Sequence, residues 1–241
     1  MTEAEWLACT DPQTMLDSLR GKASDRKLRL FACACCRRAW HLLTREQPRA
    51  AVATAERYAD GLAGPEELRQ GWSAVRKALS TAPLGTPWEE ALVAALYAAT
   101  PGPVPPEGAA GAAANALSDD PRPRGPYHPL TAKAGEAPGC PSERAFQCAL
   151  LRDLFAPFGA PEVGASWLTW GGAVAALARG AYEDRQLPSG QLDPARLAVL
   201  ADALEEAGCT NLNLLAHLRG PGPHAHGCWA VDLLLGKGVM P

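Results

Sequence analysis

The chain has 241 residues, of which 47% are hydrophobic and 20% are charged, and its formal net charge is −3. This length and composition predict one or two globular domains with a real core, and they exclude global disorder. The small negative charge gives no general attraction to nucleic acid or to anionic membranes. No apolar run approaches the roughly 20 residues of a membrane-spanning helix, so we expect no membrane partner.

The cellular compartment is predicted from the N-terminus and the cysteines. The chain begins MTEAEWLACTDP, which is acidic and lacks the basic and apolar regions of a signal peptide. The eight cysteines do not have the spacing of a secreted disulfide framework. We therefore expect a cytoplasmic protein whose cysteines are reduced.

The residue composition favours helices over strands, because alanine is abundant and β-branched residues are scarce. Helix start and stop signals recur along the chain. They predict an all-α fold, an irregular multi-helix bundle of roughly nine to eleven short helices. Two helical halves are joined by a stretch rich in proline and glycine.

The first helical half is predicted over residues 1–100. Its longest helix is predicted over 25–44, where apolar residues recur at three- and four-residue spacing. The apolar face of that helix is formed by Leu28, Phe31, Ala32, Cys35, Ala39, Leu42 and Leu43. Capping-box and Asp-Pro signals help to mark where the other helices begin. The other predicted helices of this half begin near Thr2, Asp11, Pro48, Leu68 and Trp88.

The proline- and glycine-rich stretch covers 101–141. Proline removes a backbone donor and disfavours helix in the residue before it, so we interpret 101–141 as a long loop or linker. It has room for one short helix near 109–118. The second helical half is predicted over 142–241, and the two halves form either separate domains or one packed body, because small alanine-rich halves have limited cores. Its helices begin near Ser142, Trp170, Asp193, Asn211 and Trp229.

A resemblance to a planctomycete bacterial protein family is carried by two regions. These are RGKASDRKLRLFACACCRRAWHLL, and LADALEEAGC followed by LLAHLRGPGPHAHGCWAVDLLLGK. The shorter strings WLACTDP and LLRDLF fit the same pattern, so the resemblance covers most of 1–100 and 142–237. It implies a bacterial protein and brings no activity with it. The C-terminal segment also resembles segments joined to other modules in such bacteria, which favours a portable interaction unit.

The C-terminal tail gathers cysteines and histidines around a turn of glycine and proline. Its candidate metal ligands are Cys209, His217, His224 and Cys228. Two sulfurs and two nitrogens are the donor set of a tetrahedral structural zinc site. No pair has the Cys-x2-Cys spacing of a standard zinc finger. The alternative is that the cysteines are small buried residues and the histidines bond backbone carbonyls. His226 is the least suitable ligand, because the resembled family often carries arginine at that position.

Two other cysteine hypotheses concern reactivity. Cys228 could be a nucleophile, because a cysteine near a helix N-terminus has a lowered pKa. His224 or His226 would then be the base and Asp232 the orienting group, although neighbours in sequence rarely form such a triad. We therefore name no catalytic residue. A further cluster is formed by Cys33, Cys35 and Cys36. These thiols could join a metal site or oxidise, or they could be small side chains where helices approach closely.

A basic stretch on the helix 25–44 offers candidate phosphate-binding residues, namely Arg26, Lys27, Arg37 and Arg38. They could bind nucleic acid, but no helix-turn-helix, glycine-rich loop or aromatic platform accompanies them. The alternative is a solvated face that acidic stretches partly match.

These observations lead to three functional hypotheses. The leading one is a non-enzymatic protein-interaction or scaffolding module, whose partner is a protein. The alternative is a zinc-stabilised helical module that binds nucleic acid through the helix 25–44. The third is a cysteine-dependent enzyme that uses Cys228.

Overall fold

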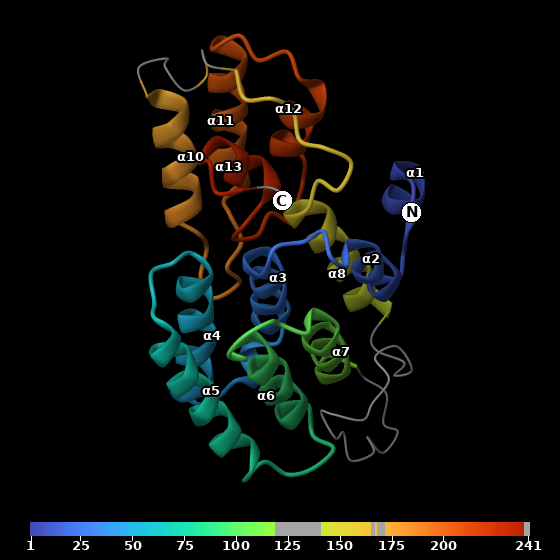
Figure 1. Ribbon diagram of the computed structural model, residues 1–241, viewed down its shortest axis with the longest axis vertical. Helices are drawn as coiled ribbons and strands as arrows, with labels where there is room; N and C mark the ends of the chain where they lie inside the picture. Colours follow the sequence, from blue (N-terminus) through green and yellow to red (C-terminus); the bar gives the residue numbers. More distant parts are fainter. Residues whose placement is uncertain (119–140, 165–166, 168–171, 239–241) are drawn as a thin grey trace. The chain divides into compact units, whose positions relative to one another are not determined.

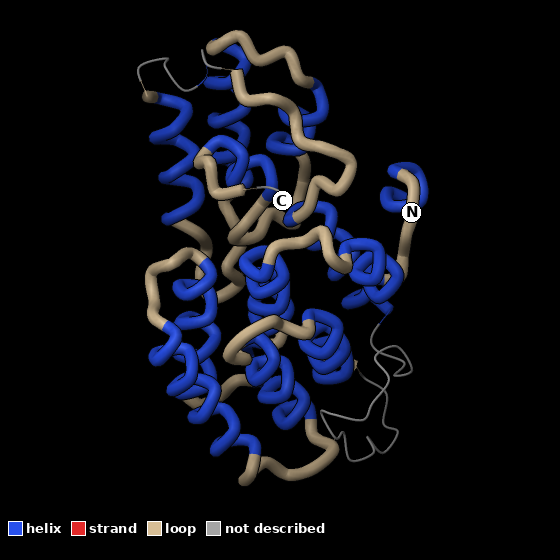
Figure 2. The backbone as a smooth tube through the Cα atoms, viewed as in Figure 1, coloured by secondary structure: helices blue, strands red, loops and turns tan. Residues whose placement is uncertain are grey.

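The computed structural model describes residues 1–118, 141–164, 167 and 172–238, and these residues fold as helices joined by loops (Figures 1 and 2). Within them no β-strand forms, and the only extended pairing is two isolated bridges, from Gln191 to Gln186 and to Ala225. The all-α prediction is confirmed. None of the described helices combines the length and the apolar character that crossing a bilayer requires.

The chain divides into two compact units, Met1–Cys148 (unit 1) and Ala149–Pro241 (unit 2). The helices wholly within unit 1 are α1 (Glu3–Ala8), α2 (Pro12–Leu19), α3 (Asp25–Arg38), the 3-10 helix η1 (Trp40–Leu42), α4 (Glu46–Ala59), α5 (Pro65–Leu79), α6 (Pro87–Ala98) and α7 (Pro106–Ala116). The described helices wholly within unit 2 are α10 (Ala173–Glu183), α11 (Pro194–Glu206), α12 (Leu212–Arg219) and α13 (Trp229–Leu234). The boundary between the units lies inside α8 (Pro141–Leu154).

Helix starts follow the capping signals of the sequence. Thr2 and Glu5 form the capping box at α1, each side chain accepting a hydrogen bond from the other's amide. Asp193 caps α11 by accepting from the Ala195 amide at 2.8 Å. Each cap satisfies an amide that the helix itself leaves without a partner. Local chemistry therefore accounts for where these helices begin.

Helix α3 is the centre of unit 1, because it packs against α4, α6 and α7. Its residues from Leu30 to Cys33 are almost completely buried. The helix predicted over 25–44 is shorter in the structure: α3 ends at Arg38, and tighter hydrogen bonds form η1. The amide of Leu43, for example, donates to the Trp40 carbonyl, three residues back. This turn brings Leu43 into the core, where it is fully buried.

Part of the stretch predicted as a linker, 101–141, belongs to unit 1. Helix α7 packs against α6 and α3, and most of its alanines are buried. Close packing requires Gly108, because a Cβ there would lie 2.6 Å from the Tyr97 ring. Small side chains thus let this proline-flanked helix join the core instead of remaining a loop. Residues 119–140 of the predicted linker lie outside the described residues.

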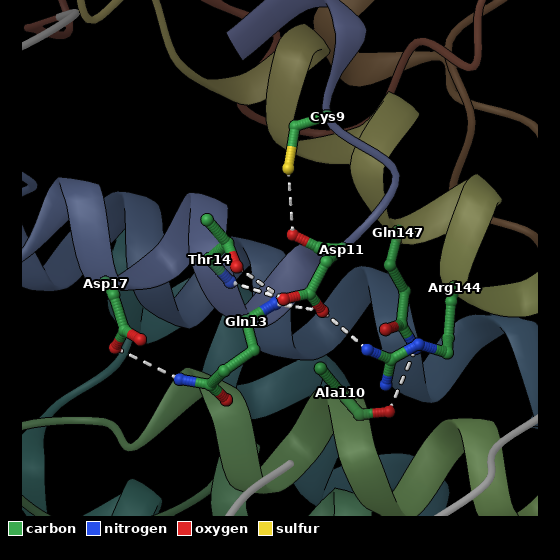
Figure 3. Close-up of polar contacts among 8 residues, drawn as sticks. All are labelled: Cys9, Asp11, Gln13, Thr14, Asp17, Ala110, Arg144 and Gln147. Atoms are coloured by element: carbon green, nitrogen blue, oxygen red, sulfur yellow. Dashed lines mark hydrogen bonds and ion pairs between the residues drawn. The ribbon is translucent and has the colours of Figure 1, made fainter. Parts of the chain in front are cut away.

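The first half of α8 is held in unit 1 by polar contacts (Figure 3). Arg144 forms an ion pair with Asp11, whose carboxylate also caps the first amides of α2. One turn further on, Gln147 donates to the carbonyl of Ala110 in α7 at 2.9 Å. These contacts explain why the unit boundary lies inside α8.

Unit 2 has a core of its own. Helix α11 packs against α10 and α12, and the short α13 packs against α10 and α12 (Figure 1). Leucines dominate this core, with Leu197, Leu200, Leu204 and Leu214 fully buried. The arrangement places the loop between α12 and α13 beside the last turn of α8, where polar side chains meet.

Candidate metal centre

Four potential metal ligands converge in unit 2. They are Asp153 from the last turn of α8, His217 from the last turn of α12, His224 from the loop after α12, and Cys228 at the start of α13. One donor atom from each lies within 4.8 Å of all the others. This cluster, which we call the Asp-His-His-Cys cluster, could hold a metal ion.

Three of the six separations between donor atoms are close to those of a tetrahedral site. The Nε2 atom of His217 lies 3.2 Å from Cys228 Sγ and 3.2 Å from Asp153 Oδ1. The Nδ1 atom of His224 lies 2.9 Å from the same oxygen. Ordinary zinc bond lengths at tetrahedral angles give donor separations of roughly 3.3–3.6 Å. Shifts of a few tenths of an ångström would therefore bring these three contacts to coordination geometry.

The carboxylate of Asp153 is positioned by the loop after α12. Its Oδ2 accepts a hydrogen bond from the Ala225 amide at 2.7 Å, which leaves Oδ1 directed at both histidines. Burial alone raises the pKa of Asp153, but hydrogen bonds and charge from His217 and His224 outweigh it and lower the pKa to about 2. Asp153 is therefore a buried anion at neutral pH.

The ring of His224 is fixed at both nitrogens. Nε2 lies 3.2 Å from the carbonyl oxygen of Gly220, and Nδ1 faces Asp153. Burial lowers the pKa of His224, but the hydrogen bond and charge of Asp153 reverse this effect and raise the pKa overall. An Nε2–H that donates to a backbone carbonyl is the usual support of a histidine that binds metal through its other nitrogen.

The loop that carries His224 depends on a glycine. Gly222 has a φ of +83°, and a Cβ there would lie 2.9 Å from the backbone nitrogen of His224. Only glycine adopts this conformation without strain, and only glycine leaves room for the next turn of the chain. The carbonyl of His224 accepts from the Leu192 amide at 2.8 Å, which fixes the loop on its other side.

The thiol of Cys228 is fully buried. Burial and the negative charge of Asp153 raise its pKa well above the ordinary value, while the amides of Val231 and Ala230 in α13 act in the opposite direction. A thiol with a raised pKa is a poor nucleophile without a cation beside it, but it remains a good ligand for a soft or borderline metal.

The structure brings together three of the four ligands that the sequence proposes: His217, His224 and Cys228. Cys209 lies outside this cluster and is buried in the hydrophobic core of unit 2. The fourth donor is Asp153, which sequence reasoning missed. A signal was present, because Asp153 lies in LLRDLF between leucines that occupy the buried face of α8.

The geometry does not support the cysteine-enzyme hypothesis. In a catalytic triad the base uses one ring nitrogen for the nucleophile and the other for the carboxylate. Both ring nitrogens of the proposed base His224 have other partners, Nδ1 facing Asp153 and Nε2 facing the Gly220 carbonyl. His217, which does contact Cys228, uses the same Nε2 atom toward Cys228 and Asp153. His226 instead lies against Arg185 and the ring of Tyr182. Cys228 is also fully buried, and burial raises the pKa of its thiol.

The basic residues proposed to bind nucleic acid are mostly buried or paired with carboxylates within unit 1. Arg37 is buried in an ion pair with Glu56, and Lys27 is 1% exposed. Arg26 pairs with Asp60 at 2.9 Å. The fourth residue, Arg38, is more exposed, but it pairs with Glu143 and lies over the Phe146 ring. The packing of α3 against other helices therefore buries Lys27 and Arg37, and Arg26 and Arg38 have carboxylate partners within unit 1.

The three cysteines of α3 are part of the core of unit 1. Cys33, Cys35 and Cys36 are all buried, and burial raises the pKa of each thiol well above its ordinary value. They are small side chains at the point where α3 meets its neighbours, and none belongs to the Asp-His-His-Cys cluster.

Comparison with known proteins gives no match to a protein-family model, to a curated protein or to a solved structure. The functional argument therefore depends on the geometry of the cluster.

Proposed function

We propose that unit 2 is a zinc-stabilised helical module, in which Asp153, His217, His224 and Cys228 bind one zinc ion. One observation carries the proposal: four donors from separate segments converge within 4.8 Å in a largely buried position. Four protein ligands without an open position are typical of structural zinc sites, whereas catalytic sites retain a position for water or substrate.

The donor chemistry supports zinc among the common metals. Two imidazoles, a carboxylate and a thiolate form a borderline set, whereas calcium and magnesium prefer oxygen ligands alone. A zinc ion at the centre would take the place of the proton on Nδ1 of His224, while Nε2 keeps its bond to Gly220. It would also compensate the buried charge of Asp153.

The role of the module is proposed to be non-enzymatic. The ion would tie the last turn of α8 to α12 and to the loop before α13, so that unit 2 presents a fixed helical surface to a protein partner. A cytoplasmic location is part of the proposal. It is supported by the free thiols of all seven cysteines that the described residues include.

The first test is metal content and its effect on stability. We expect one zinc per purified chain by atomic emission. Zinc at about 100 times its dissociation constant is expected to stabilise the folded unit by about 2.7 kcal/mol. Thermal unfolding before and after chelation measures this difference. Absence of zinc, with the same unfolding curve after chelation, would overturn the proposal.

A matched pair of variants locates the ion. Cys228→Ala and Cys209→Ala each remove one buried thiol from the core of unit 2, but only the first removes a donor from the cluster. We expect Cys228→Ala to abolish the chelator effect and Cys209→Ala to retain it. Equal behaviour of the two variants would count against this ligand set.

A further inference from the structure

The four ligands of the cluster differ in how firmly the protein holds them. Asp153 has a second anchor at the Ala225 amide, and His224 has one at the Gly220 carbonyl. Cys228 has its sulfur beside the first amides of α13. Among the described residues, the imidazole of His217 has no hydrogen bond outside the cluster and is held by ring contacts with His224 and Trp229.

His217 also differs from the other three ligands in its exposure to solvent. The side chain of His217 is 19% exposed, whereas those of Asp153 and His224 are 2% and 3% exposed and Cys228 is fully buried. An incoming donor can therefore approach the centre beside His217 and not beside the other ligands. His217 also lies in the last turn of α12, two residues before its final residue, Arg219.

We infer that His217 is the exchangeable ligand of the metal centre, the position at which the ion enters and leaves and at which an external donor can replace the protein. This inference rests on the proposed zinc site. The exchange breaks the bond between the metal and Nε2 of His217, and a bond to the lone pair of the incoming donor forms in its place. No proton or electron is transferred. Asp153, His224 and Cys228 remain as the fixed three-ligand set.

The experiment uses cobalt(II) as a coloured substitute for zinc and imidazole as the external donor. Wild-type protein, His217→Ala and His224→Ala are loaded with cobalt; visible absorption reports four-coordinate geometry, and near-ultraviolet absorption reports the thiolate bond. Release into excess chelator is followed at the same wavelengths. His226→Ala is the control for a histidine in the same loop but outside the cluster.

We expect His217→Ala to keep the thiolate band, to lose four-coordinate intensity, and to release cobalt on the order of 10- to 100-fold faster, the scale seen when the support of a metal site is lost. Added imidazole is expected to restore both the intensity and the slow release. It is expected to restore neither in His224→Ala, because the position left there is enclosed. Equal rescue of both variants, or no rescue of His217→Ala, would overturn the inference.

A second measurement does not depend on the folding of His224→Ala. If departure of His217 limits release, the wild-type rate becomes independent of chelator concentration once chelator is abundant. In His217→Ala the position is already open, so the rate rises in proportion to chelator. Proportional behaviour in both proteins would contradict the inference. Failure of the proposed zinc site looks different, because wild-type protein would then show no cobalt spectrum.

Discussion

Both units bury charged side chains, but they satisfy them in different ways. In unit 1 two buried arginines have separate partners: Arg37 pairs with Glu56, and Arg29 donates to the carbonyls of Ala98, Thr100 and Gly102 at and just after the end of α6. In unit 2 the four donor atoms of the Asp-His-His-Cys cluster lie within 4.8 Å of one another. These two arginines of unit 1 are paired without any ion, whereas the cluster of unit 2 could hold a cation.

This difference shows which feature identifies a metal centre. Burial of acidic and basic residues is common to the two units, so burial alone does not separate them. The close grouping of several metal-binding donor atoms does separate the two units. A paired arginine, in contrast, already donates its N–H groups to fixed oxygens. We therefore expect the two units to respond differently to metal.

The largest effect is expected in unit 1 and should not depend on metal. Glu56→Ala leaves Arg37 buried without its anion, and removing one partner of a buried ion pair costs about 3–5 kcal/mol. Denaturant unfolding with and without chelator measures this loss. We expect the same loss in both conditions. A loss that appears only after chelation would show that the comparison between the units is wrong.

Next in size is the loss of the ligand that sequence reasoning missed. Asp153→Asn keeps the shape of the side chain but removes the anionic donor, so we expect zinc at about 100 times the wild-type dissociation constant to give less than its 2.7 kcal/mol stabilisation. Unfolding at fixed free zinc measures the difference. If the variant gains as much from zinc as the wild type, the carboxylate is not a ligand.

The contrast between predicted and missed residues has a physical basis. His217, His224 and Cys228 lie within one short segment, so their chemistry is visible along the sequence. Asp153 is 71 residues from its partner His224, and only the packing of α8 brings them together. Cys209 has the same chemistry as Cys228, and nothing local distinguishes the two.

The helices were more predictable than the environment of their polar residues. Caps such as Thr2 and Asp193 act on the nearest amides, so the sequence alone indicates where α1 and α11 begin. Whether a cation on a helix faces water depends on which helices surround it. Lys27 and Arg37 lie on a helix with neighbours on several sides, which periodicity along one segment does not reveal.

A smaller effect is expected from the loop glycine. Gly222→Ala places a side chain at a φ of +83°, which costs roughly 1–2 kcal/mol, and it displaces His224. Zinc affinity is expected to fall about 10- to 100-fold, as when other supports of a metal ligand are removed. Gly236→Ala is the matched control, because its φ is +66° but no atom lies within 4 Å of the added Cβ. Competition with a coloured chelator measures both affinities, and an equal decrease in the two variants would exclude a specific role for Gly222.

The smallest effect concerns pH and again belongs to unit 1. Burial raises the pKa of Glu143, although the charge and hydrogen bond of Arg38 and a hydrogen bond from Gln147 oppose the shift. A carboxyl group with a raised pKa binds its proton more tightly in the folded state, so its ionised form costs stability. This cost is present above the folded pKa and disappears as the pH falls toward the unfolded value of 4.5. Glu143→Gln removes the titration, so the wild type should gain stability relative to the variant between pH 7 and pH 4.5. Denaturant unfolding at several pH values measures this difference. If the wild type gains no stability relative to Glu143→Gln over this pH range, the pKa of Glu143 is not raised by burial in the folded state.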